Sequence, residues 1–117
     1  MEGKKNSWSS TDLVKTLKVA RKTFYWLKAF GYSRSTTRLL DVGCATGYYT
    51  ESFRLLGCDV VGIDYSDVAI SQAKLKFTEC TFIQMNGFEP DFSENFDVIF
   101  CRGFSGVNTH DLKFVSD

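Results

Sequence analysis

Apolar residues recur with two different patterns along this chain. Between positions 13 and 27 they recur every three or four residues, with Lys and Arg on the remaining face, which predicts an amphipathic helix that ends near Gly31. Beyond position 37, short apolar runs alternate with helical patterns. The expected strands are RLLDV (38–42), DVVGID (59–64), TFIQM (81–85) and FDVIFC (96–101), and the expected helices cover 47–56 and 66–77.

The amino-terminal helix has a recognisable start and a wide apolar stripe. Ser10 or Thr11 is the expected N-cap, with Asp12 in the first turn. We expect Trp26 and Phe30 to widen the stripe on one side. A basic amphipathic helix of this kind can lie on an anionic membrane, but packing on its own domain is the favoured interpretation.

Strands that are apolar on both faces and alternate with helices indicate a parallel sheet covered on both sides. We therefore predict an α/β fold with three layers, a doubly wound and mostly parallel sheet, divided into a lead-in with a cap helix (1–37) and a core (38–117). No strand is expected after 96–101, so the fold would lack its carboxyl-terminal strands. Either the chain is a fragment, or a homodimer or partner chain covers the exposed edge of that fourth strand.

Composition and charge indicate one folded domain with two oppositely charged parts. The chain has 117 residues and no net charge. Residues 1–39 hold nine Lys or Arg and two Asp or Glu, about +7, whereas residues 40–117 hold five and twelve, about −7. The acidic part suits a cationic ligand and the basic part an anionic partner, although both also fit ordinary solvated faces.

Cysteine usage and hydropathy point to the cytoplasm. The four cysteines lie at positions 44, 58, 80 and 101, without a Cys-x-x-Cys pair, and His110 is the single histidine, so we expect reduced thiols and no metal site. The amino terminus lacks the apolar core of a secretory signal, and no apolar run is long enough to span a bilayer.

The stretch LLDVGCATGYYT carries the main chemical signal. Gly43, Ala45 and Gly47 follow a buried strand and are small enough to let a ligand approach the backbone, next to the positive end of a helix. Asp64 stands 21 residues after Gly43, at the end of the next strand, which suits a carboxylate that binds both hydroxyls of a ribose. A ligand-free turn and an acid at a helix N-terminus are the structural alternatives.

Two residues distinguish between the classes of ligand that contain a nucleoside. Asp41 would repel a pyrophosphate but suits an ammonium or sulfonium group, and Tyr48 stands where a nicotinamide-binding motif needs its third glycine. A nucleotide-dependent oxidoreductase is therefore the weaker alternative. The interpretation as an enzyme that acts on nucleic acid depends on the basic amino-terminal segment alone and is not favoured.

The chain resembles the class I methyltransferases that use S-adenosylmethionine. LLDVGCATGYYT is similar to their first motif, VVGIDYS to their second, and FDVIFCRGFS to their fourth-strand motif, so the resemblance covers about residues 38–105. It implies a Rossmann-like fold and in-line transfer of a methyl group to an acceptor that is expected to be a small molecule. The alternative is a truncated module that binds the cofactor, or dimerises, without catalysis of its own.

The resemblance also implies a role for individual residues. The loop backbone would receive the methionine end, Asp41 its ammonium, Asp64 the ribose and Tyr65 the adenine, while Asn86 stands where the family usually has an acid that binds the adenine amino group. Ala45 replaces the usual middle glycine and costs little only if its φ is negative. No catalytic base is assigned. The implied cofactor-binding residues are Asp41, Gly43, Cys44, Ala45, Gly47, Asp64, Tyr65, Asn86, Gly87, Cys101 and Arg102.

Overall fold

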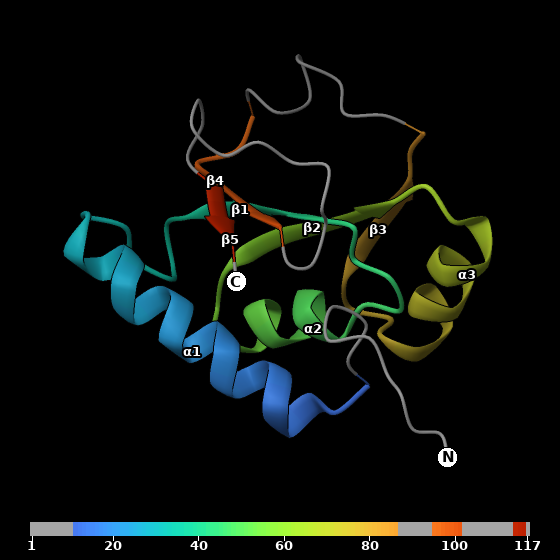
Figure 1. The fold of residues 1–117 in the computed structure, drawn as a ribbon, viewed down its shortest axis with the longest axis horizontal. Coiled ribbons are helices and arrows are strands. Elements are labelled where there is room, and N and C mark those ends of the chain that lie inside the picture. The colour runs from blue at the N-terminus through green and yellow to red at the C-terminus, as the bar shows by residue number, and fades with distance from the viewer. Residues whose placement is uncertain (1–10, 87–94, 102–113, 117) are drawn as a thin grey trace.

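A computed structural model describes residues 11–86, 95–101 and 114–116 of the chain (Figure 1). Helices and strands alternate along these residues, as the apolar pattern predicts. The elements are α1 (Leu13–Ala29), β1 (Arg38–Val42), α2 (Tyr48–Leu55), β2 (Asp59–Asp64), α3 (Asp67–Lys76), β3 (Thr81–Gln84), β4 (Val98–Cys101) and β5 (Phe114–Ser116). Each of the four expected strands is present, and its bounds differ from the prediction by no more than two residues.

The strands form one sheet in the order β3-β2-β1-β4-β5, and every pairing is parallel. β1 lies in the centre, and the chain builds outward to β3 on one side before it returns to place β4 on the other. This reversal of strand order confirms the doubly wound α/β topology. In such sheets ligands bind outside the carboxyl ends of the strands at the reversal, which here is the end of β1.

The prediction that no strand follows the fourth was wrong. β5 pairs with β4, with Phe114 beside Ile99 and Ser116 beside Cys101. A three-residue strand carries too weak an apolar pattern to be separated from a loop by sequence alone. Because the chain itself covers this edge of β4, the reason for expecting a homodimer or partner chain there is lost.

α1 begins one or two residues later than expected. Its N-cap is Asp12, whose carboxylate accepts hydrogen bonds from the backbone of Val14 and Lys15, so Asp12 lies before the first turn and neither Ser10 nor Thr11 is the cap. The helix ends as predicted, since Gly31 adopts a left-handed φ of 92° and its N–H bonds the carbonyl oxygen of Lys28.

The buried stripe of α1 is narrower than predicted. Trp26 and Phe30 are 60% and 75% exposed and do not widen it, whereas Thr16 and Thr23 are buried. Thr16 is held by a buried hydrogen bond of 2.8 Å between its hydroxyl and that of Ser52 in α2. A short polar side chain that finds such a partner fits a helix–helix contact better than a large ring. None of the described helices combines the length and apolar character that crossing a bilayer requires.

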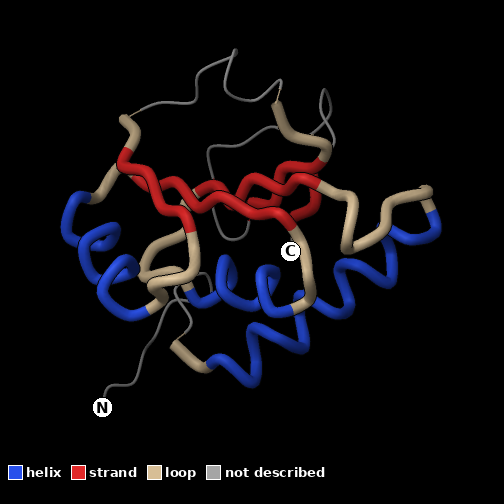
Figure 2. The backbone as a smooth tube through the Cα atoms, turned by 180° about the vertical axis from the view of Figure 1, so that it is seen from behind, coloured by secondary structure: helices blue, strands red, loops and turns tan. Residues whose placement is uncertain are grey.

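All three described helices lie on one face of the sheet, with α1 outside α2 (Figures 1 and 2). Because successive side chains of a strand point to opposite faces of the sheet, alternate residues of β1 enter two different hydrophobic clusters. Leu39 packs with Phe53 of α2, whose ring lies 4.9 Å from that of Phe100 in an edge-on contact. Leu40 points to the opposite face, where it clusters with Ile99, and both are buried.

Candidate cofactor site

The loop between β1 and α2 makes three left-handed backbone turns in five residues. Its positive φ angles are 75° at Gly43, 51° at Ala45 and 92° at Gly47. Glycine adopts these angles freely, but a side chain with a Cβ atom is strained there, so Ala45 occupies the costly conformation that the sequence left open. The loop is anchored at its start, because the N–H groups of Gly43 and Cys44 both bond the carbonyl oxygen of Ile63, each at 2.9 Å.

Gly47 begins α2 without a capping side chain. It is the N-cap residue, and no side chain accepts from the first turn of the helix. A Cβ atom at this position would lie 2.6 Å from the ring of Phe82, so the loop is packed tightly against β3. The helix therefore presents N–H groups and its positive end toward the strand ends, an arrangement that favours a carboxylate.

Asp41 is a buried carboxylate beside this loop. It is 3% exposed, and its Oδ2 atom accepts a hydrogen bond of 2.6 Å from the hydroxyl of Thr50. Among the described residues, no donor reaches its Oδ1 atom. Burial raises the pKa of Asp41 from 3.8 to about 7, the bond from Thr50 opposes this rise, and the nearby charge of Asp64 adds to it. A cation placed here would relieve both the desolvation and the repulsion.

Asp64 connects the two loops of the site. Its Oδ2 atom accepts a 2.8 Å hydrogen bond from the N–H of Ala45, and its Oδ1 atom accepts a 3.0 Å bond from the N–H of Ser66 before α3. The alternative of an acid at a helix N-terminus is therefore part of its role. Each carboxylate oxygen can accept a second bond, so the group still has capacity for two hydroxyl donors.

Tyr65 and Asn86 lie beyond Asp64, at the carboxyl ends of β2 and β3. Tyr65 is 71% exposed, so its ring is open to a ligand. Asn86 is exposed too, and its Oδ1 atom accepts a bond of 3.1 Å from the side-chain amide of Gln84, which also donates to the carbonyl oxygen of Tyr65 at 2.8 Å. Gln84 thereby holds both residues in place.

The remaining predicted site residues contribute differently or fall outside the description. The side chain of Cys44 is buried among side chains of α3 and β3, so only its backbone is available to a ligand of the loop. Cys101 ends β4 next to β1 and is 2% exposed, and burial raises the pKa of its thiol to about 11. Gly87 and Arg102 lie outside the described residues.

Three residues of the site were not predicted from the sequence. Thr50 and Gln84 bind predicted site residues through their side chains. Gly62 leaves room for Thr50, since a Cβ atom at position 62 would lie 2.6 Å from the Thr50 hydroxyl. Nothing in the local sequence pattern distinguishes these three residues.

The chain matches one protein family over most of its length. Residues 39–116 fit the family model described as a methyltransferase domain. The Ubiquinone biosynthesis O-methyltransferase of Bradyrhizobium sp. (strain ORS 278) is 38% identical over 73 residues, which is 56% of this chain and 27% of that protein. The enzyme of the same name from Marinobacter nauticus (strain ATCC 700491 / DSM 11845 / VT8) is 35% identical over 72 residues, 55% of this chain and 30% of that protein. The match thus spans less than a third of these relatives.

Solved structures share the fold. The magnesium protoporphyrin IX methyltransferase from Synechocystis PCC 6803, solved with bound SAM, is 20% identical with a TM-score of 0.58, and the match covers 88% of this chain and 52% of that one. The plantazolicin methyltransferase, solved with a pentazolic desmethylPZN analog and SAH, is 28% identical with a TM-score of 0.58, over 80% of this chain and 37% of that one.

Proposed function

The chain belongs to the methyltransferase-domain family, and on that premise we propose that it binds S-adenosylmethionine at the carboxyl end of β1 and supports transfer of its methyl group to a small-molecule acceptor. The solved relatives hold SAM or its demethylated product SAH. The observation that carries the proposal is the buried Asp41 carboxylate, which has one oxygen without a donor among the described residues and lies beside a positive helix end.

These two features fit the two charges of an amino acid. The ammonium of the methionine end would pair with Asp41, whose charged form burial disfavours in the absence of a cation. The carboxylate would take the N–H groups at the start of α2, where Gly47 supplies no competing side chain. A neutral or wholly anionic ligand would leave one of these features unused.

The nucleoside end fits the next two strands. Asp64 would accept from the ribose hydroxyls with the second lone pairs of its oxygens, and the exposed ring of Tyr65 would lie against the adenine. Asn86 would contact the adenine edge through its amide. We further propose that Gly87 and Arg102 complete the adenine and acceptor sides, as their places in the motifs imply.

When bound, S-adenosylmethionine supplies a sulfonium centre that makes its methyl group electrophilic. The residues of this chain bind it, orient it and align it with an acceptor, and such alignment supplies much of the acceleration of a two-reactant step. The described residues provide no group to which we assign the role of general base. The curated relatives act, by their names, as O-methyltransferases of ubiquinone biosynthesis, which supports a small-molecule acceptor here.

Titration calorimetry tests the cofactor assignment directly. We expect S-adenosylmethionine and S-adenosylhomocysteine to bind and NAD to release no heat. Tyr65→Ala removes an exposed ring without touching the core, so it should weaken binding about tenfold, since base stacking contributes about 1–3 kcal/mol. Leu75→Ala is the matched control, because Leu75 is 82% exposed and lies in the last turn of α3, away from the carboxyl ends of the strands. Equal affinity in both variants, or binding of NAD instead, would contradict the proposal.

We also propose a cytoplasmic setting. All four cysteines are free thiols, and burial raises the pKa of Cys58 and of Cys80 to about 12. Such thiols are unreactive and suit a reducing compartment. Labelling in native buffer should therefore modify no buried cysteine until the protein is unfolded.

A further inference from the structure

The surface of α1 that faces away from α2 is uniformly cationic and carries exposed aromatic rings. The helix holds five Lys or Arg and no Asp or Glu. Its side opposite the buried stripe combines four of these cations with two rings that are 78% and 60% exposed. We call this surface the outer face of α1, and it consists of Lys15, Lys18, Arg21, Lys22, Tyr25 and Trp26.

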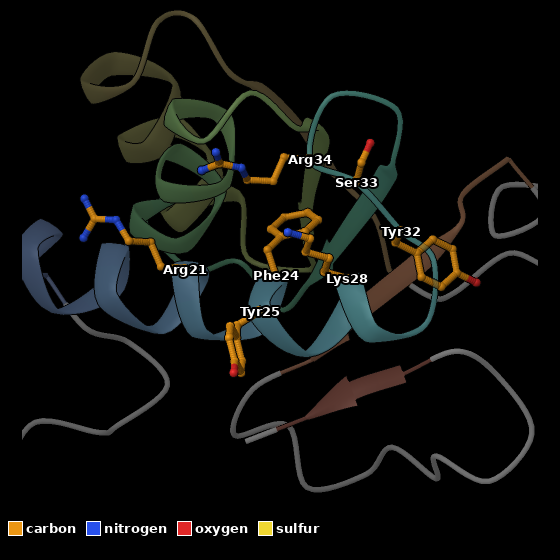
Figure 3. A pocket seen from close by; sticks show the side chains of 7 residues that line it. All are labelled: Arg21, Phe24, Tyr25, Lys28, Tyr32, Ser33 and Arg34. Atoms are coloured by element: carbon orange, nitrogen blue, oxygen red, sulfur yellow. The ribbon is translucent and has the colours of Figure 1, made fainter.

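A pocket of about 450 Å³ borders the outer face. It lies between α1 and the connection to β1, and three cations surround it: Arg21 and Lys28 from the helix, and Arg34 from the connection (Figure 3). Phe24 and Tyr32 contribute its apolar walls. Two ion pairs of the described residues, Arg38 with Asp59 and Arg54 with Glu51, lie away from this pocket.

We propose that the outer face of α1 docks on an anionic phospholipid membrane, with a headgroup phosphate in the pocket between Arg21, Lys28 and Arg34. This surface is separate from the cofactor site. Thr16 of α1 is hydrogen-bonded to Tyr48 and Ser52 of α2, whereas the pocket begins more than one helical turn further along α1. The proposal does not depend on the methyltransferase assignment.

Charge and ring chemistry together favour a membrane over a nucleic acid. A 17-residue helix is about 25 Å long and can lie flat on a bilayer, where each cation near the surface contributes about 1 kcal/mol. Tyr and Trp rings prefer the headgroup level, where an apolar body and a polar tip are both satisfied. Single-stranded nucleic acids are instead bound in concave, positively charged grooves, whereas the outer face of α1 is the convex surface of a helix.

Trp26 provides the readout. The chain has two tryptophans, so a Trp8→Phe background leaves Trp26 as the single tryptophan, whose emission is read with excitation that tyrosine does not absorb. Vesicles of phosphatidylcholine mixed with phosphatidylglycerol should shift its emission to the blue, and vesicles of phosphatidylcholine alone should not. High salt should reduce the shift, because it screens exposed charges.

Two matched double variants separate docking from net charge. Lys18→Gln with Lys22→Gln removes two cations from the outer face and should weaken binding to the anionic vesicles about 25-fold. Lys74→Gln with Lys76→Gln removes two exposed cations from α3 and should leave it unchanged. Arg34→Gln tests the pocket and should weaken binding about fivefold. Far-UV circular dichroism and melting temperature check the fold of every variant.

Three results would overturn the proposal. The first is equal binding to neutral and anionic vesicles, and the second is equal loss in the α1 and α3 double variants. The third is tight, salt-sensitive binding of a single-stranded oligonucleotide without binding to vesicles, which would assign the face to a nucleic acid. Calorimetry with S-adenosylmethionine on the same preparations keeps a failure of docking distinct from a failure of the cofactor assignment.

Discussion

Replacing Asp41 by Asn keeps the size and shape of the side chain and removes its charge. The amide oxygen of Asn can still accept the hydrogen bond that the hydroxyl of Thr50 donates over 2.6 Å. The carboxylate is 3% exposed, so the native protein holds an acid that water can hardly stabilise. The substitution should therefore change stability and cofactor binding in opposite directions.

The size of the stability change follows from the pKa of Asp41. Burial raises it from 3.8 to about 7, so between pH 4 and 7 the folded state keeps a proton that the unfolded state has lost. The free energy of unfolding that this group contributes is present below about pH 4 and is lost as the pH rises through 7, at up to about 1.4 kcal/mol per pH unit. Asp41→Asn should remove this slope and stabilise the protein at pH 8 by about 2 kcal/mol, with an upper limit of about 4 kcal/mol.

The effect on binding has the opposite sign. A charge-assisted hydrogen bond contributes about 1.5–3 kcal/mol, so loss of the carboxylate should weaken S-adenosylmethionine binding about 10- to 100-fold at pH 8. Urea unfolding at pH 5, 6, 7 and 8, with calorimetry at pH 8, measures both quantities. Asp67→Asn is the control, because Asp67 is an exposed acid on α3. A variant that is less stable than the parent at pH 8, or that binds as tightly, would refute the reasoning.

Three further substitutions test the loop, the sheet and the cap helix. Ala45→Gly should raise the free energy of unfolding by about 1 kcal/mol in urea titration, because φ is 51° there; destabilisation would show that the angle carries no strain. Gly62→Ala should cost about 1–3 kcal/mol in the same assay, since its Cβ atom would lie 2.6 Å from the Thr50 hydroxyl, and a neutral effect would mean that the threonine moves freely. Asp12→Ala should lower stability by about 1 kcal/mol and reduce helical circular dichroism through loss of the N-cap, and an unchanged signal would show that the cap is dispensable.

Strand and helix positions in the core were predictable because the sheet is parallel and buried. Runs such as 59–64 are apolar at successive positions, and four successive residues of this strand are buried, which makes the signal strong. The failures came where tertiary contacts outweigh local pattern. Trp26 is exposed although it is apolar, and Thr16 is buried because Ser52 supplies a hydrogen bond from another helix. β5 needs the neighbouring edge of β4 to be recognised as a strand at all.

The candidate site divides in a similar way. Gly43, Gly47 and Asp64 could be identified because their residue types are constrained by backbone angle or by charge at a fixed spacing. Thr50 and Gln84 could not, since they act through hydrogen bonds to residues 9 positions back and 19 positions back along the chain. Such contacts depend on how α2 packs on the sheet and how β3 pairs with β2 within it, which spacing alone does not determine.

Ala45 shows why the loop keeps its shape without the middle glycine. A left-handed φ costs an alanine about 1–2 kcal/mol, and this angle accompanies the 2.8 Å hydrogen bond from its N–H to the carboxylate of Asp64. A hydrogen bond to a charged acceptor contributes about 1.5–3 kcal/mol, which is enough to offset the strain. The conformation of the loop is therefore fixed by an acid on the neighbouring strand. That same acid is the residue we propose to hold the ribose, so in the proposed complex the shaping of the loop and the binding of the nucleoside overlap in Asp64.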